Sequence, residues 1–253
     1  MDPGIYLARI GAALPAAADL ATLAELQRRH LLTVPFENLS VLYGEPIVLE
    51  ERQLYAKVVE RRRGGFCYEL NGLFAWLLRI LGYRVDRIAA EVYDRSAGQF
   101  GLPFDHMALI VHLDRPYLVD VGFGDSARTP LPLPDGMAED VSGAYRVAIR
   151  DDHAHLERRT ADGWIPEFRF TTQPHTLADY HAMCGYHSTS PESHFTRRLV
   201  CTRATTTGRL TLTGDAFVVT RGRAKRRTPV APAQRAGYLL RHFGIHLAPL
   251  SPA

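Results

Sequence analysis

The chain has 253 residues, of which 46% are hydrophobic and 23% charged, as is typical of a soluble globular protein. A chain of this length buries roughly 70–75% of its unfolded surface, so we expect a large core. The 20 glycines and 16 prolines follow no period, which excludes collagen-like and low-complexity classes. The three cysteines, Cys67, Cys184 and Cys201, are too few for a disulfide scaffold. No CxxC or HExxH pattern occurs, so we expect no metal site.

The formal net charge is +3 and the sequence pI is about 8.8. This mildly basic balance argues against a dedicated nucleic-acid-binding protein and suits an anionic ligand. Asp19 and Glu25 interrupt the alanine-rich N-terminal stretch, so we predict no signal peptide. No window of 18 apolar residues indicates a membrane span. We therefore expect a cytoplasmic protein with reduced thiols and no membrane partner.

The first part of the chain, residues 1–83, is predicted to be helical. Leucines over residues 20–31 recur at the spacing of one apolar helix face, and Asp19 is placed to cap that helix. A second helix is expected over residues 50–62. A third begins near Cys67, with Gly82 as its stop, and its buried face is formed by Leu70, Leu73, Phe74, Leu77, Leu78 and Leu81.

Beyond residue 84 the pattern changes to short runs rich in Val, Ile and Tyr, which are typical of strands. We predict an antiparallel sheet or barrel, with a short helix near residues 177–183. The expected strands cover 85–93, 107–113, 117–122, 145–149, 155–157, 167–171, 210–213 and 216–220. Helices followed by strands predict an α+β architecture rather than repeated βαβ units.

A basic run at residues 221–227 follows the last expected strand. We interpret it as a solvated loop. The alternative is a field that attracts phosphate groups.

Cys67 is the candidate nucleophile. It follows arginines at 61–63 and glycines at 64–65, and it begins a strongly amphipathic helix. Helix N-terminal N–H groups and nearby arginines favour an anion, so we expect a lowered thiol pKa. The alternative is a small buried core residue, the common role of a free cysteine.

His106 and Asp120 are the candidate partners of this thiol. A thiolate nucleophile needs a proton acceptor, and the acceptor needs a group that orients it. Asp120 lies in an apolar segment, where a carboxylate requires a partner. A hairpin that turns around Arg115 places His106 and Asp120 on one face but two pairs apart, and direct opposition requires a turn centred at Leu113. The sequence leaves this register open.

Five segments together resemble the arylamine N-acetyltransferase family. They lie in the same order as the family's segments, they span residues 34–195, and the decapeptide around the cysteine is highly specific. The segments are Val34-Pro35-Phe36-Glu37-Asn38-Leu39, Arg63-Gly64-Gly65-Phe66-Cys67-Tyr68-Glu69-Leu70-Asn71-Gly72, Asp105-His106, Leu118-Val119-Asp120-Val121-Gly122-Phe123-Gly124 and Pro191-Glu192-Ser193-His194-Phe195.

The resemblance implies a helical bundle over 1–83 carrying the nucleophile, an antiparallel β-barrel over 84–185 carrying His and Asp, and a short α/β lid over 186–253. The core is expected to be related to papain-like cysteine enzymes. Cys67, His106 and Asp120 form the implied catalytic triad. The implied donor is acetyl-CoA, and the implied acceptors are aromatic amines or hydrazines. An acetyl-cysteine intermediate implies ping-pong kinetics.

The resemblance also implies binding residues. Phe36, Tyr68, Phe123 and Phe195 match aromatic positions of the family's acceptor pocket, with simple core packing as the alternative. Gly122 and Gly124 match the region near the cofactor. Asp125 departs from the family, in which many members have Gly, and an acidic side chain there does not favour phosphate.

Other functions remain open from sequence alone. A similar group of enzymes uses the same triad as an amide synthase that closes macrolactams on carrier-bound polyketides. A cysteine hydrolase resolves the acyl-enzyme with water, and a binding module retains the fold without turnover. The acceptor, the physiological donor and the oligomeric state are not determined by the sequence.

Overall fold

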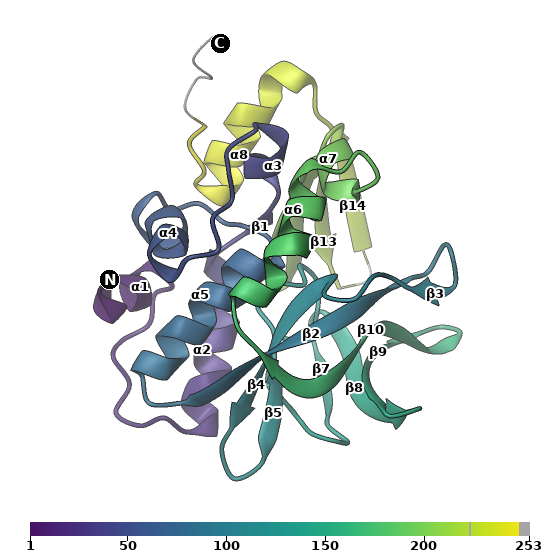
Figure 1. Cartoon of the computed structure of the whole chain (residues 1–253). Helices are drawn as coiled ribbons and strands as arrows, with labels where there is room; N and C mark the ends of the chain where they lie inside the picture. Colours follow the sequence, from purple (N-terminus) through teal and green to yellow (C-terminus); the bar gives the residue numbers. More distant parts are fainter. Residues whose placement is uncertain (223, 248–253) are drawn as a thin grey trace.

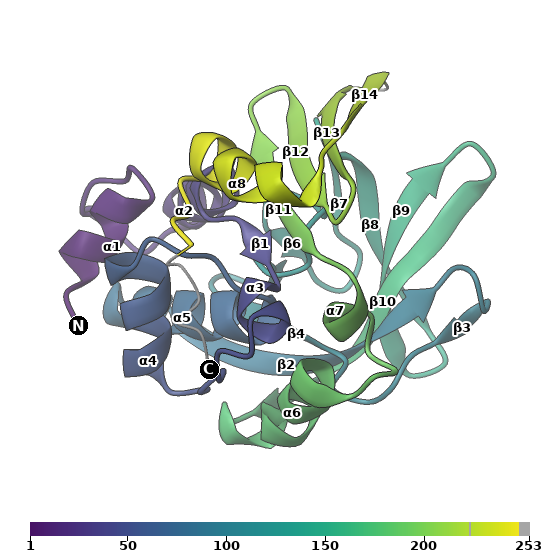
Figure 2. The same cartoon turned by 90° about the horizontal axis from the view of Figure 1, so that it is seen from above.

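The computed structural model describes residues 1–222 and 224–247. Helices α1, α2, α4 and α5 gather on one side of the molecule, strands β2–β10 on another, and strands β11–β14 form a separate sheet (Figures 1 and 2). Both sheets are antiparallel throughout, as expected for an α+β fold. Each of the three regions has its own buried apolar cluster.

The N-terminal helices begin and end close to the predicted positions. The side chain of Asp19 caps α2 by accepting a hydrogen bond from the N–H of Thr22 at 2.8 Å. The predicted helix over residues 50–62 is confirmed in part, because its second half is a π-helical turn. The elements are α1 (Pro3–Arg9), α2 (Leu20–Thr33), α3 (Leu39–Leu42), α4 (Glu51–Tyr55), the π turn (Ala56–Glu60) and α5 (Cys67–Ile80).

Helix α5 lies at the centre of the molecule, and residues 67–78 are all buried. Its first turn is held by Glu69, which accepts a hydrogen bond from the N–H of Phe66 at 3.1 Å. The other carboxylate oxygen of Glu69 binds buried Lys57 at 2.6 Å. The helix is followed by Gly82 in the left-handed conformation (φ 92°), as predicted. These contacts fix the position of Cys67 at the helix start.

Strands β2–β10 form a nine-stranded sheet that is a nearly closed barrel. The order is β6-β5-β4-β2-β10-β9-β8-β7, with β3 paired to β2. The buried residues inside it include Ile88, Ile110, Tyr145 and Phe168. The strands are β2 (Arg84–Asp94), β3 (Gln99–Phe100), β4 (His106–His112), β5 (Pro116–Val119), β6 (Leu131–Pro132), β7 (Met137–Asp140), β8 (Gly143–Arg150), β9 (His153–Thr160) and β10 (Gly163–His175).

The register of β4 and β5 differs from both predicted alternatives. Ile110 pairs with Leu118, so the turn is centred on Asp114 rather than on Arg115 or Leu113. Strand β5 ends at Val119, earlier than expected, and Asp120 begins the following loop. Continuing this register makes Asp120 a diagonal neighbour of His106, which is within side-chain reach.

The second sheet has the order β1-β11-β12-β13-β14. Strand β1 (Phe36–Glu37) comes from the N-terminal region and pairs Phe36 with Thr202. The expected domain boundary at residue 185 lies inside α6. The remaining elements are a 3-10 turn (Ala178–Tyr180), α6 (His181–Thr189), α7 (His194–Arg197), β11 (Val200–Thr205), β12 (Gly208–Thr213), β13 (Ala216–Arg221), β14 (Ala224–Pro229), a 3-10 turn (Pro232–Gln234) and α8 (Arg235–Phe243).

The interpretation of residues 221–227 as a loop was wrong. Arg221 ends β13 and pairs with Ala224, and residues 224–227 continue into β14. Arg223 lies outside the described residues. The side chains of Lys225, Arg226 and Arg227 are exposed, so the charge of the run is solvated as expected. Residues 224–229 show no apolar alternation that would predict a strand. They form one because they pair with β13.

Buried polar contacts fasten the second sheet to the rest of the molecule. Arg128, which precedes β6, donates to the carbonyls of Thr205 and Gly208 at 2.6 Å each. Asn38 donates to the carbonyls of Phe195 and Arg198 at 2.7 Å each. Both side chains are buried, so these carbonyls depend on them for hydrogen bonds.

We predict that Arg128→Ala lowers the free energy of unfolding by about 3 kcal/mol, because two buried carbonyls lose a charged donor. Urea unfolding followed by circular dichroism measures the change. Arg159→Ala, at an exposed position of β9, is the control and is expected to change stability by less than about 0.5 kcal/mol. Equal stability of the two variants would contradict the role of Arg128 in fastening the second sheet.

Candidate active site

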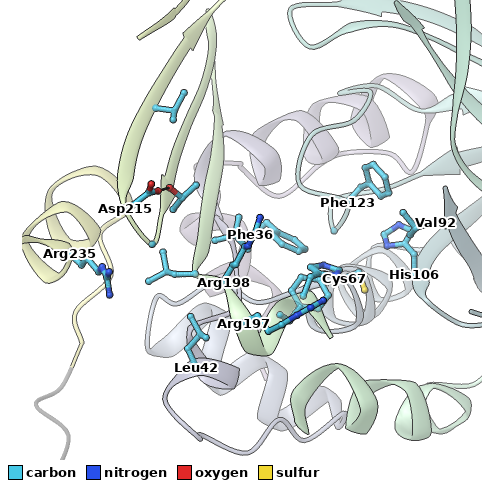
Figure 3. A pocket seen from close by; sticks show the side chains of 18 of the residues that line it. Phe36, Leu42, Cys67, Val92, His106, Phe123, Arg197, Arg198, Asp215 and Arg235 are labelled. Carbon is cyan, nitrogen blue, oxygen red and sulfur yellow. Dashed lines mark hydrogen bonds between the residues drawn. The ribbon is translucent and has the colours of Figure 1, made fainter. Parts of the chain in front are cut away.

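Cys67, the first residue of α5, lies on the wall of a cavity of about 1320 Å³ (Figure 3). His106, Gly122 and Phe123 line the same end of the cavity. These residues come from α5, from the start of β4 and from the loop after β5. The fold therefore brings together the thiol and the histidine that the sequence singled out.

The environment of the thiol differs from the expectation. Burial raises the pKa of the Cys67 thiol well above its usual value, and the negative charges of Asp105 and Asp120 act in the same direction. A hydrogen bond with the Met107 backbone opposes this shift in pKa. The prediction of a lowered thiol pKa was therefore wrong, and the thiol needs a base to become a nucleophile.

The arginine run before Cys67 does not supply the expected positive field. Arg63 is buried and forms an ion pair with Glu37 at 2.9 Å. Arg61 pairs with Glu45, and the carbonyl of Arg62 accepts a hydrogen bond from Arg9. The charges of Arg61 and Arg63 are thus balanced by carboxylates, which explains why they leave the thiol unactivated.

His106 and Asp120 are in direct contact. The Nε2 atom of His106 lies 2.7 Å from Oδ2 of Asp120, and both side chains are buried. The ring packs edge-on against Phe123, with centroids 5.2 Å apart. Because Nε2 is engaged by the carboxylate, Nδ1 is the ring nitrogen left for Cys67.

The Asp120 carboxylate is held by two further donors. Its Oδ1 accepts hydrogen bonds from Nδ2 of Asn71 at 2.8 Å and from the N–H of Gly122 at 2.7 Å. Three hydrogen bonds satisfy a carboxylate that is 5% exposed. Such support is required, since a buried charge without partners is strongly destabilising.

Asn71 is a positioning residue that the sequence analysis missed. Its Nδ2 also donates to the carbonyl of Met107 at 2.6 Å, and its Oδ1 accepts from the N–H of Val121 at 2.9 Å. It therefore links α5 to β4 and to the loop that carries Asp120. The signal in the sequence was its spacing. Asn71 follows Cys67 by four residues in the predicted helix, so the two side chains lie on the same helix face.

The two glycines predicted near the cofactor have different surroundings. A Cβ atom on Gly122 would lie 2.8 Å from Cα of Cys67 and 2.7 Å from Nδ2 of Asn71, so only glycine allows this close packing. Gly124 has a φ of 94° and faces Phe36 and Thr202. Gly122 is on the cavity wall, whereas Gly124 is outside the residues that line it.

Asp125, the departure noted from the family pattern, is turned to two arginines. Its carboxylate oxygens lie 3.1 Å from Arg158 and 3.0 Å from Arg209. Its charge is therefore neutralised, and it ties β9 to β12 rather than facing the cavity.

Three of the four predicted acceptor-site aromatics line the cavity: Phe36, Phe123 and Phe195. Phe36 and Phe195 pack together with centroids 6.0 Å apart. Tyr68 is fully buried behind this wall, and its hydroxyl donates to the carbonyl of Phe104 at 2.7 Å. Tyr68 therefore supports the loop before His106 instead of facing the cavity.

The other cysteines lie in the core. Burial raises the pKa of Cys184 to about 12, and it also raises the pKa of Cys201. In residues 1–222 and 224–247 no group of three or more His, Cys, Asp or Glu side chains is arranged to hold a metal ion. Across the same residues no helix has the length and apolar character needed to cross a membrane.

Comparison with known proteins gives a consistent result. A family model described as N-acetyltransferase matches residues 19–251. An arylamine N-acetyltransferase of Mycolicibacterium smegmatis is 37% identical over an alignment of 259 positions, which covers 99% of this chain and 94% of that protein.

Two solved structures share the fold. The crystal structure of a Cys-to-Gln variant of the Mycobacterium smegmatis enzyme has a TM-score of 0.90 at 36% identity, covering 97% of this chain and 93% of that one. The Mycobacterium marinum arylamine N-acetyltransferase in complex with CoA has a TM-score of 0.89 at 33% identity, covering 96% and 93%.

These matches confirm the predicted α+β fold class and extend the resemblance from short segments to almost the whole chain. The active-site decapeptide around Cys67 and the contact between His106 and Asp120 agree with it. The chain belongs to the arylamine N-acetyltransferase family and is an acyltransferase.

Proposed function

We propose that this protein moves the acetyl group of acetyl-CoA to the nitrogen of an aromatic amine or hydrazine through an acetyl-cysteine intermediate. The observation that carries the proposal is Cys67 on the wall of a large cavity beside His106, whose ring is fixed by Asp120. Family membership and the CoA complex of the Mycobacterium marinum relative support acetyl-CoA as the donor.

In the first half-reaction His106 accepts the thiol proton at Nδ1, and the thiolate attacks the thioester carbonyl. Burial raises the pKa of Cys67, so this proton transfer is the step that creates the nucleophile. The tetrahedral intermediate collapses by breaking the bond to the CoA sulfur, and His106 returns the proton to that sulfur. The N–H of Cys67, in the first turn of α5, is the candidate donor to the oxyanion.

In the second half-reaction the amine attacks the acetyl-cysteine carbonyl. An aromatic amine is a weak base and is neutral near pH 7, so its lone pair is available. His106 accepts a proton from the amine nitrogen and returns it to the Cys67 sulfur as the amide forms. Asp120 holds His106 in one tautomer and stabilises the imidazolium that His106 forms in each half-reaction.

The acceptor ring is assigned to the aromatic part of the cavity wall. Phe36, Phe123 and Phe195 line the cavity together with Cys67. Aromatic side chains bind a flat aromatic ring through apolar burial and edge-to-face contacts. This wall favours an aryl amine or aryl hydrazine over a strongly hydrated alkyl ammonium ion.

Intact-protein mass spectrometry after mixing with acetyl-CoA alone tests the proposal. We expect one added acetyl group on Cys67, which is lost when an aromatic amine is added. Cys67→Ala is expected to take up no acetyl group, and Cys184→Ala is the matched cysteine control that retains uptake. No acetylation, with Cys67 still reactive to a mild alkylating reagent, would reject acetyl-CoA as the donor.

We predict that Asn71→Ala lowers kcat/KM by about 100-fold, because Asp120 and His106 lose their alignment. The rate of Cys67 alkylation across pH is the second readout, since a purely structural role would leave its shape unchanged. Ser188→Ala, on helix α6, serves as the control. Unaltered turnover in Asn71→Ala would show that Gly122 and His106 alone position the carboxylate.

The pH dependence of Cys67 alkylation distinguishes the ionisation of the thiol itself from its activation by His106. Burial raises the pKa of the Cys67 thiol, so in His106→Ala the thiolate is scarce at neutral pH and alkylation should rise only above the usual cysteine value of about 8.5. In the wild-type protein we expect rapid alkylation near pH 7. Superimposable profiles for both proteins would mean that His106 is not the base.

A further inference from the structure

The backbone of Phe104, two residues before His106, is in the left-handed conformation, with a φ of 64°. A residue as bulky as phenylalanine rarely adopts this conformation, because its Cβ atom crowds the backbone. Such a residue persists only where its surroundings hold it, and such residues concentrate at functional sites. The contacts that hold Phe104 therefore help to decide where strand β4 begins and where the ring of His106 lies.

The hydroxyl of Tyr68 holds this segment from helix α5. It donates to the carbonyl of Phe104 at 2.7 Å, and the carbonyl of Asp105 lies 3.3 Å away. Burial raises the pKa of Tyr68 well above its usual value, so the phenol keeps its proton and remains a donor. The Tyr68 ring packs edge-on against Phe66 and in a tilted contact with Tyr180, with centroids 5.1 and 5.6 Å away. The hydroxyl is therefore held in place by its own packed ring.

The side chain of Phe104 is held separately, by aromatic packing. Its ring lies edge-on to His175 and to Tyr180, with centroids 4.8 and 5.2 Å away. The hydroxyl of Tyr180 is buried and has no hydrogen-bond partner within residues 1–222 and 224–247. Tyr180 thus contributes packing to this cluster, whereas Tyr68 contributes a hydrogen bond to the backbone.

The two residues that follow Phe104 have partners on different elements. The Oδ1 atom of Asp105 lies 3.0 Å from Nε2 of His187, which belongs to α6. The Nε2 atom of His106 lies 2.7 Å from Oδ2 of Asp120, in the loop after β5. The backbone conformation at Phe104 therefore sets the direction of two consecutive side chains, and a change in it would displace both contacts.

Helix α5 binds the backbone on both sides of His106. Tyr68 binds the carbonyl two residues before the histidine, and Asn71 donates to the carbonyl of Met107, one residue after it, at 2.6 Å. The same helix begins with Cys67, which lies on the cavity wall together with His106 (Figure 3). These two hydrogen bonds thus fix the backbone that carries the histidine to the helix that carries the thiol.

We propose that Tyr68 is a positioning residue for His106. Its hydroxyl keeps Phe104 in the left-handed conformation from which β4 begins, and this holds His106 at the separation from Cys67 that proton transfer requires. The inference rests on the proposed function, in which His106 is the base. It gives Tyr68 a role in acyl transfer although its side chain is outside the cavity wall. Proton transfer requires close approach of donor and acceptor, so a small displacement of His106 slows both half-reactions.

Tyr68→Phe removes the hydroxyl and leaves the ring. We expect the limiting rate of Cys67 acetylation at saturating acetyl-CoA to fall roughly tenfold, with the half-saturating acetyl-CoA concentration changed by less than about twofold. Tyr180→Phe is the matched control, because it removes from the same aromatic cluster a hydroxyl that has no partner in the described part of the chain. Urea unfolding verifies that both variants fold. An unchanged limiting rate in Tyr68→Phe would overturn the proposal.

A pair of substitutions tests the role of the backbone at Phe104. Phe104→Gly and Phe104→Ala both remove the ring, but only glycine adopts a positive φ freely. Each is combined with Tyr68→Phe. We expect loss of the hydroxyl to lower the acetylation rate roughly tenfold in the Phe104→Ala background and less than about threefold in the Phe104→Gly background. Equal losses in the two backgrounds would show that the hydroxyl does not act through the conformation of Phe104, and would overturn the proposal.

The pH profile of Cys67 alkylation is a readout that a purely structural role would not move, and it needs no acyl donor. In Tyr68→Phe we expect alkylation at neutral pH to fall toward the rate of His106→Ala. At alkaline pH, where the thiol ionises without a base, the rates of Tyr68→Phe and the wild-type protein should agree within about twofold. A Tyr68→Phe profile with the wild-type shape would contradict a positioning role.

Failure of the proposed function gives a different pattern of results. A wild-type protein that takes up no acetyl group from acetyl-CoA would reject the donor. The alkylation profiles of the wild-type, Tyr68→Phe and His106→Ala proteins would then still decide the role of Tyr68. Coincident profiles for the wild-type protein and His106→Ala would reject His106 as the base, and the positioning role of Tyr68 with it.

Discussion

The organisation of this protein depends on one buried carboxylate, that of Asp120. It accepts hydrogen bonds from a strand residue, His106, from a helix residue, Asn71, and from the N–H of Gly122 in its own loop. A carboxylate buried to this extent is tolerated only when its oxygens are fully hydrogen-bonded. Its requirement for partners therefore holds helix α5, strand β4 and the loop after β5 in fixed relative positions.

Burial of Cys67 disfavours the charged form of its thiol. It raises the pKa of Cys67, so the surroundings of the thiol do not ionise it by themselves. In the proposed mechanism the thiol is activated by His106, which Asp120 orients, rather than by the arginines that precede the cysteine. Those arginines are paired with Glu37 and Glu45, where they stabilise the loop that leads into α5.

The second sheet supplies part of the cavity wall. Strand β1, with Phe36, joins this sheet, and Asn38 binds the carbonyls of Phe195 and Arg198. One short N-terminal segment thus positions Phe36, Phe195 and Arg198, all of which line the cavity. The aromatic wall of the cavity and the contact between His106 and Asp120 are thus held by different hydrogen-bond networks, one centred on Asn38 and the other on Asp120.

The sequence by itself determined the local features. Helix periodicity, the Asp19 cap and the decapeptide around Cys67 predicted the nucleophile at the start of a buried helix, and the family resemblance predicted its partners. Such signals are readable because they depend on residues within a few positions of each other. The tertiary structure decided which charges meet. The turn centred on Asp114 brings His106 within reach of Asp120, and the packing of distant elements pairs Arg61 and Arg63 with Glu45 and Glu37. The partner of a charged side chain is set by long-range packing, and no local pattern in the chain records it.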